Sequence, residues 1–146
     1  MDQLGTIRKV LQLKERREEE IELEVRELRD AVSAQETLLG SLERAYVETL
    51  ESFARRQRDG SLPPHEMGVF YSYLYHLSQQ MDAKKAEISR TLSALDARHG
   101  ALVEAHKETR IVESLKDRRS LDYAKEESRQ ERKEMDFLAS TLRGDR

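Results

Sequence analysis

The chain contains only two prolines, and they are adjacent, at Pro63 and Pro64. Proline lacks the backbone N–H that an internal helical position uses, so no regular helix continues through this point. Gly60 lies just before them and permits the positive φ that often ends a helix. Residues 59–64 therefore predict a tight turn, and both flanking segments are free of strong helix breakers.

The composition favours helices over strands. Ala, Glu, Lys, Leu and Arg make up more than half of the chain, and 38% of all residues are charged. Such usage, when it is joined to a 3.5-residue period, is typical of long helices and coiled coils. Only six glycines are present, which is too little turn chemistry for a sandwich, a barrel or a series of βα loops. We expect an all-α protein without a thick single core.

Apolar residues before the turn follow the alternating steps of three and four that form the seam of a coiled coil, the stripe of side chains that faces the partner helix. The apolar positions of this stripe are Leu4, Ile7, Leu11, Ile21, Val25, Leu28, Val32, Leu39, Leu42, Tyr46 and Phe53. The polar exceptions are Lys14, Glu18, Gln35 and Thr49. We expect one helix over about residues 3–58.

The same stepping continues after the turn and predicts a second helix over about residues 65–142. Its apolar positions are Phe70, Leu74, Leu77, Met81, Ile88, Leu95, Leu102, Ala105 and Val112. Folding at the turn pairs positions whose numbers sum to about 123, which brings Phe53 near Phe70 and Leu28 near Leu95. We therefore expect a single domain over residues 1–146, a long antiparallel two-helix coiled-coil hairpin. It should be a monomer, because closing so short a loop is entropically cheap.

Two features of this hairpin are irregular. Lys14 faces Thr109 next to Glu18, which makes one layer without an apolar side chain and a predicted weak point of the seam. The second helix is also longer than the first by about 20–25 residues, or roughly 30–35 Å at the helical rise. Residues 122–146 then have no partner in the chain. Apolar residues reappear here in a different phase, at Leu121, Met135, Leu138 and Leu142.

Aromatic residues gather near the predicted turn, at Tyr46, Phe53, Phe70, Tyr71, Tyr73 and Tyr75. The seam can cover the first three. Tyr71 and Tyr75 lie four residues apart, on a different helix face from Phe70 and Leu74. Two interpretations remain open: an aromatic plug that stops the turn from fraying, or a docking patch for a partner.

The sequence does not indicate an enzyme. Catalysis needs a concave pocket that excludes water, which a two-helix hairpin does not supply. The four histidines form neither an HExxH motif nor an i, i+4 pair that chelates zinc. We therefore expect no catalytic residue, no metal, no cofactor and no small-molecule substrate.

Charge and targeting signals point to a protein that acts through protein partners. Acidic and basic residues are interleaved and the net charge is -3, so nucleic-acid binding is not supported. Cysteine is absent, which gives no sign of an oxidising compartment. Neither a signal peptide nor a run of about 18–20 apolar residues is present. The expected location is the cytoplasm.

Several of these features together resemble the FliJ family of the bacterial flagellar type III export apparatus and its counterparts in virulence secretion systems. The resemblance covers nearly the whole chain. It rests on the longer second arm and on Tyr46 late in the first helix. It also rests on the series that opens the second helix and on the charged tail, namely Phe70, Tyr73, Leu74, Leu77, Met81, Lys133, Met135, Asp136 and Ala139.

The resemblance implies a central stalk that inserts its terminal helices into the hexameric export ATPase. Further implied partners are the cytoplasmic ring of the export gate and the export chaperones, which would place the protein at the cytoplasmic face of the inner membrane. The implied gate contacts are Tyr46, Phe70, Tyr73, Leu74 and Leu77. We add Tyr71 and Tyr75, because the seam is not expected to cover them. The tail residues Leu121, Met135, Leu138 and Leu142 are the expected contacts to the ATPase ring. The alternative is a plain coiled-coil scaffold or a prefoldin-like holding chaperone.

Overall fold

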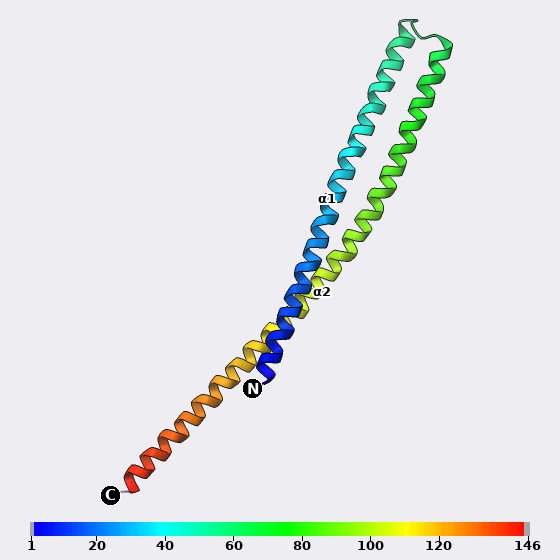
Figure 1. The fold of residues 1–146 in the computed structure, drawn as a ribbon. Helices are drawn as coiled ribbons and strands as arrows, with labels where there is room; N and C mark the ends of the chain where they lie inside the picture. Colours follow the sequence, from blue (N-terminus) through cyan, green and yellow to red (C-terminus); the bar gives the residue numbers. More distant parts are fainter. Residues whose placement is uncertain (1, 145–146) are drawn as a thin grey trace. The chain divides into compact units, whose positions relative to one another are not determined.

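The computed structural model describes residues 2–144, which form two long helices joined by a short turn (Figure 1). α1 spans Asp2–Arg58 and α2 spans Pro64–Gly144, close to the predicted spans of about 3–58 and 65–142. The two helices pack against each other, and the described residues include no strand. The predicted all-α helical hairpin is confirmed. None of the described helices is long and apolar enough to cross a bilayer.

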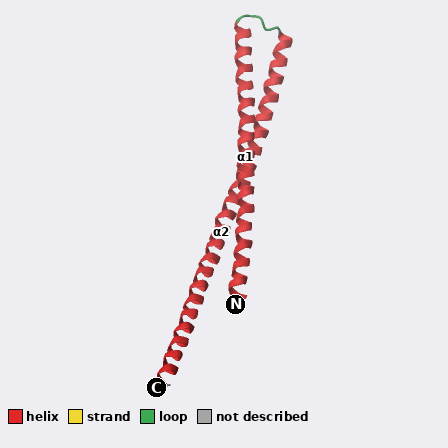
Figure 2. Cartoon of the chain, turned by 60° about the vertical axis from the view of Figure 1, so that its left-hand side comes forward, coloured by secondary structure: helices red, strands yellow, loops and turns green. Residues whose placement is uncertain are grey.

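Each helix passes through two compact units. One, which we call the terminal unit, consists of Met1–Ile21 and Ala101–Arg146; the other, the turn unit, is Glu22–Gly100. Within each unit a stretch of α1 and a stretch of α2 lie side by side and run in opposite directions (Figures 1 and 2).

A Schellman motif ends α1 in the turn unit. The Ser61 N–H donates to the carbonyl of Arg56 over 3.0 Å, and the Gly60 N–H donates to the carbonyl of Gln57 over 3.4 Å. Gly60 has a φ of 68 degrees, in the left-handed region that disfavours other residues. The glycine predicted to end the first helix therefore does so.

Proline then begins the second helix. Pro64 occupies the first helical position, where the absent N–H would have had no helical partner in any case. The carbonyl of Pro63 accepts hydrogen bonds from the N–H groups of Glu66 at 3.0 Å and Met67 at 3.2 Å. The adjacent prolines thus fix the residue at which α2 begins. Figure 2 shows the short loop that joins the two helices before this point.

The predicted seam is present in both units. Every position of the two predicted stripes is buried or half-buried. The most buried apolar side chains of the turn unit are Val25, Val32, Leu74, Leu77 and Ile88, and those of the terminal unit are Leu11, Ile21 and Ala105. Two ion pairs between the helices show which residues face each other. Arg98 Nη1 lies 2.9 Å from Glu24 Oε2, and Lys14 Nζ lies 2.9 Å from Glu108 Oε2. Both pairs agree with the predicted sum of about 123.

A hydrogen-bonded polar layer interrupts the seam of the turn unit. Gln35 Nε2 donates to Glu87 Oε1 over 3.2 Å and to Thr91 Oγ1 over 3.1 Å. Lys84 Nζ donates to Glu87 Oε2 over 2.8 Å. This hydrogen bond and the charge of Lys84 lower the pKa of the Glu87 carboxyl, and the amide of Gln35 adds to the effect. The layer therefore connects both helices through directional contacts.

A second polar layer lies in the terminal unit, where the sequence predicted one. Lys14 pairs with Glu108, and His106 Nδ1 lies 2.7 Å from Glu18 Oε1. Thr109 is buried and donates its hydroxyl hydrogen to the Ala105 carbonyl of its own helix over 2.9 Å. The predicted polar layer is therefore present, and its cross-helix contacts are the Lys14–Glu108 ion pair and the His106–Glu18 hydrogen bond, both at partly exposed side chains.

In the terminal unit α2 extends past the start of α1, as predicted. All described residues from Leu121 to Gly144 are exposed. Figures 1 and 2 both show this part of α2, which we call the tail, without a neighbouring helix. The tail is a single exposed helix, and the side-chain contacts given for it, Arg129 with Glu126 and Thr141 with the Phe137 carbonyl, lie within the tail itself.

Candidate functional site

Aromatic rings pack across the two helices next to the turn. The ring centroids of Phe53 and Phe70 lie 5.4 Å apart with 66° between the ring planes, an edge-to-face arrangement that aromatic pairs favour. Tyr71 also packs on Phe53, with 5.5 Å between the centroids. The ring contacts that an aromatic plug requires are therefore present between Phe53, Phe70 and Tyr71.

An arginine reinforces this aromatic packing. The Arg56 guanidinium lies over the Phe70 ring, 5.8 Å from its centroid, within the range of a cation–π contact. The same side chain forms an ion pair with Glu66 at the start of α2 and donates to the Ser61 carbonyl over 3.0 Å. One side chain of α1 thus contacts the loop, the first turn of α2 and the aromatic plug. These contacts hold the residues around Phe70 in one arrangement.

The seven proposed gate-contact residues differ in exposure. Leu74 and Leu77 are buried in the seam, and Tyr46 and Phe70 are half-buried. Tyr71, Tyr73 and Tyr75 are exposed, with 59%, 47% and 68% of their surface accessible. A partner can therefore touch the three tyrosines directly, whereas the two leucines support the surface from beneath.

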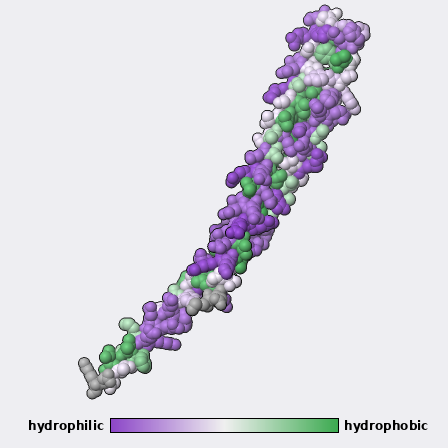
Figure 3. Space-filling model, viewed as in Figure 1, coloured by the Kyte–Doolittle hydropathy of each residue, from purple (hydrophilic) through white to green (hydrophobic). Residues whose placement is uncertain are grey.

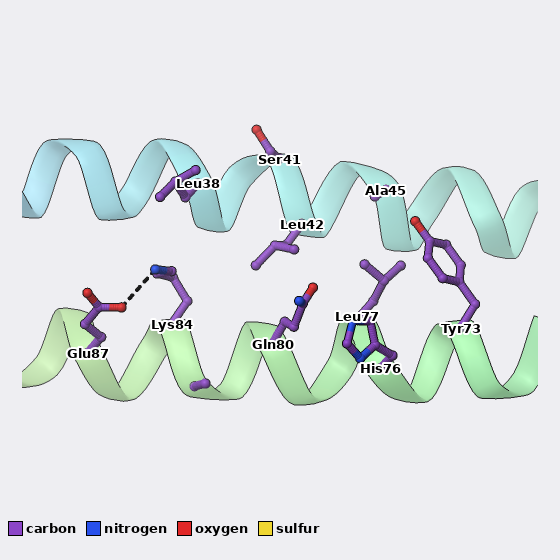
Figure 4. A pocket seen from close by; sticks show the side chains of 11 residues that line it. Leu38, Ser41, Leu42, Ala45, Tyr73, His76, Leu77, Gln80, Lys84 and Glu87 are labelled. Atoms are coloured by element: carbon purple, nitrogen blue, oxygen red, sulfur yellow. Dashed lines mark hydrogen bonds and ion pairs between the residues drawn. The ribbon is translucent and has the colours of Figure 1, made fainter.

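A groove of about 600 Å³ runs between α1 and α2 in the turn unit. Its walls include the small residues Ser41 and Ala45 on α1 and Ala83 on α2. Figure 4 shows that Tyr73 borders this groove on α2, with Leu42 and Leu77 between the two helices. The remaining lining residues are Leu38, His76, Gln80, Lys84 and Glu87. The groove is open and largely apolar, which suits an extended or helical protein segment better than a small molecule.

Leu38 and His76 belong to this surface but were not predicted from the sequence. Both lie outside the seam stepping, so a search for seam positions passes over them. Small residues lie beside the seam on both helices, at Ser41, Ala45 and Ala83, and small side chains on facing helices leave a groove. This pattern could have indicated the groove, and with it Leu38 and His76, from the sequence. No group of metal-ligating side chains is present within residues 2–144.

The tail carries the second candidate surface. Leu121, Met135, Leu138 and Leu142 are 57–70% exposed. Figure 3 shows apolar surface gathered toward the C-terminal end of α2. Phe137 and Tyr123 are exposed there as well and were not predicted. They lie off the stripe of the four aliphatic residues, so the apolar surface of the tail is wider than one stripe.

Comparisons with known proteins agree with these features. The family model described as "Flagellar FliJ protein" matches residues 3–144. The match includes both helices, the turn, the groove and the tail. Neither the curated proteins nor the solved structures gave a match.

Proposed function

Because the chain belongs to the flagellar FliJ family, a component of flagellar or type III protein export, we propose that it acts as the central stalk of the export ATPase ring. In this role it has no catalytic activity of its own. It links the hexameric ATPase to the cytoplasmic ring of the export gate and escorts export chaperones. It works as a monomer in the cytoplasm, at the cytoplasmic face of the inner membrane when it is bound to the export apparatus.

The uncovered tail is the observation that carries this proposal. Four aliphatic side chains, Leu121, Met135, Leu138 and Leu142, are exposed on a helix that has no partner among the described residues. Burying each of them contributes roughly 1.5–3 kcal/mol before the cost of association. That is enough to hold one end of a stalk in a ring. A stalk that contacts the subunits of a ring unequally alters their turnover without touching the nucleotide.

Three exposed tyrosines near the turn supply the proposed gate contact: Tyr73 borders the groove, and Tyr71 and Tyr75 lie on another side of α2. Tyr71, Tyr73 and Tyr75 are exposed, and tyrosine is enriched at protein interfaces. The seam residues Leu74 and Leu77, together with Tyr46 and Phe70, hold this surface in place. We assign the direct contacts to the tyrosines and the supporting role to the other four residues.

The central experiment removes the tail. Deletion of residues 122–146 should abolish stimulation of the cognate export ATPase and leave the hairpin folded, because every half-buried residue of the seam lies before residue 122. Far-UV circular dichroism and sedimentation check the fold. Full stimulation by the shortened protein would contradict the stalk role and favour a plain scaffold or holding chaperone.

A substitution pair separates the apolar surface from mere tail length. One variant changes the four aliphatic tail residues to serine and should lose stimulation as the deletion does. The matched control changes two basic and two acidic tail residues to serine, Lys125, Arg129, Glu126 and Glu134, which preserves the net charge. The control should keep most of the stimulation. Equal losses in both variants would mean that helix stability in the tail, rather than apolar contact, explains the result.

A further inference from the structure

The first turns of α1 have few apolar contacts with α2. We call residues 2–20 of α1 the strap. Its apolar seam residues are Leu4, Ile7 and Leu11, and only Leu11 is buried. The α2 residues that continue the seam opposite the strap are small or polar except for one valine, namely Ala105, Thr109, Val112, Lys116 and Ser120. The apolar area that holds the strap closed is therefore small.

The polar layer lies between Leu11 and Ile21. Ile21 is among the most buried of the described residues. The Lys14–Glu108 ion pair and the Glu18–His106 contact involve side chains that are partly exposed. Partly exposed polar contacts of this kind contribute little to stability. The buried Thr109 hydroxyl bonds within its own helix, so separating the helices leaves it satisfied.

Packing is also loose at the outer end of the strap. A groove of about 310 Å³ lies between the helices there, lined by Gln3, Thr6 and Ile7 on α1 and by Leu115 and Arg119 on α2. Side chains that leave such a space between them forfeit much of their dispersion energy. Three features thus coincide in one segment: little apolar burial, partly exposed polar contacts and a gap.

We propose that the strap separates from α2 as a local unit, with the Lys14–Glu18 layer as the opening point, while residues 22–100 stay closed. Segments with few buried apolar contacts open locally at a fraction of the global unfolding free energy. Opening uncovers α2 from about Ala105 to Ser120 and lengthens the single helix that a partner can reach. The use of this segment by the export ATPase rests on the proposed function, whereas the opening itself does not.

The absence of cysteine makes thiol labelling a clean test. Leu11→Cys places a thiol on the seam face of the strap, and Val32→Cys places one in the seam of the turn unit. The parent side chains are matched in exposure, at 7% and 9%. Static accessibility alone therefore predicts equal alkylation rates. Strap opening predicts that the cysteine at position 11 reacts roughly tenfold faster or more, at a temperature well below global unfolding.

A repair variant ties the opening to the polar layer. Lys14→Leu together with Glu18→Leu replaces the layer by apolar side chains and should slow labelling at position 11 toward the rate at position 32. The rate at position 32 should not change. Hydrogen exchange on the unmodified chain provides a second measurement, with faster exchange expected for the amides of the strap than for residues 25–50. Equal labelling rates, uniform exchange, or a repair variant without effect would each overturn the proposal.

Discussion

The turn unit and the terminal unit share one heptad stepping but fill it differently. In the turn unit, Phe53 and Phe70 pack edge to face, Arg56 braces the loop, and Gln35 hydrogen-bonds across the helices. In the terminal unit, the layer between Leu11 and Ile21 is filled by an ion pair, a histidine–glutamate contact and a threonine. The period therefore specifies where two helices meet, and the side chains at the meeting positions decide how firmly they are held there.

The largest expected effect tests this difference with one type of substitution. Leu77→Ala in the turn unit should lower the free energy of unfolding by about 2–5 kcal/mol, because it removes a buried side chain that packs between the two helices. Leu11→Ala in the terminal unit should lower it by less than about 1 kcal/mol, since a locally opening segment contributes little to global unfolding. Both leucines are buried in the folded chain. Urea denaturation followed by circular dichroism measures the two losses, and equal losses would remove the distinction between the units.

The features that determine the hairpin could be predicted because each depends on local sequence. Seam positions follow from spacing, and the turn follows from Gly60 and the two prolines. The roles of Arg56 and Gln35 could not be predicted in this way. Each depends on which rotamer a long side chain adopts once the partner helix is in place. Phe137 was missed because it lies off the aliphatic stripe of the tail.

The next effect sharpens the comparison at the turn. Gly60 has a positive φ. Gly60→Ala forces a side chain into the left-handed region and should destabilise the hairpin by about 1–2 kcal/mol. The control is Gly100→Ala, inside α2, where an added Cβ meets open space. That variant should gain about 0.5–1 kcal/mol, because alanine favours a helix interior. Thermal unfolding of both proteins gives the signs, and a neutral Gly60 variant would mean that the Schellman motif is not needed.

Substitutions of two tyrosines in the turn unit compare a ring that packs on a neighbour with a ring that is more exposed. The Tyr71 ring contacts Phe53, whereas Tyr75 is the more exposed of the two. Tyr71→Ala should lower stability by about 0.5–1.5 kcal/mol, because it removes an aromatic pair. Tyr75→Ala should change stability by no more than about 0.5 kcal/mol, as is usual for a surface substitution. The double variant should weaken binding to the purified cytoplasmic ring of the export gate, measured by calorimetry. Unchanged binding in a folded double variant would remove these tyrosines from the proposed contact.

The smallest expected effect concerns the polar layer of the turn unit and depends on pH. Lys84 holds the pKa of Glu87 below its ordinary value of 4.5. A carboxyl with a lowered folded pKa binds fewer protons in the folded state, so its contribution to stability is present above pH 4.5 and is lost as the pH falls through the folded pKa. The thermal midpoint should therefore fall less steeply on acidification below pH 4.5 in the Glu87→Gln variant than in the parent chain.

Lys84 makes the largest contribution to the lowered pKa of Glu87, so a variant without Lys84 tests where the acid dependence of the midpoint comes from. Lys84→Met should flatten the acid dependence of the midpoint much as Glu87→Gln does. The double variant should flatten it no further, because both changes interrupt one interaction and their effects are not additive. An additive double variant would show that each side chain acts through a different partner. The hydrogen bond that Gln35 donates from the other helix would then be the contact that stabilises the Glu87 carboxylate.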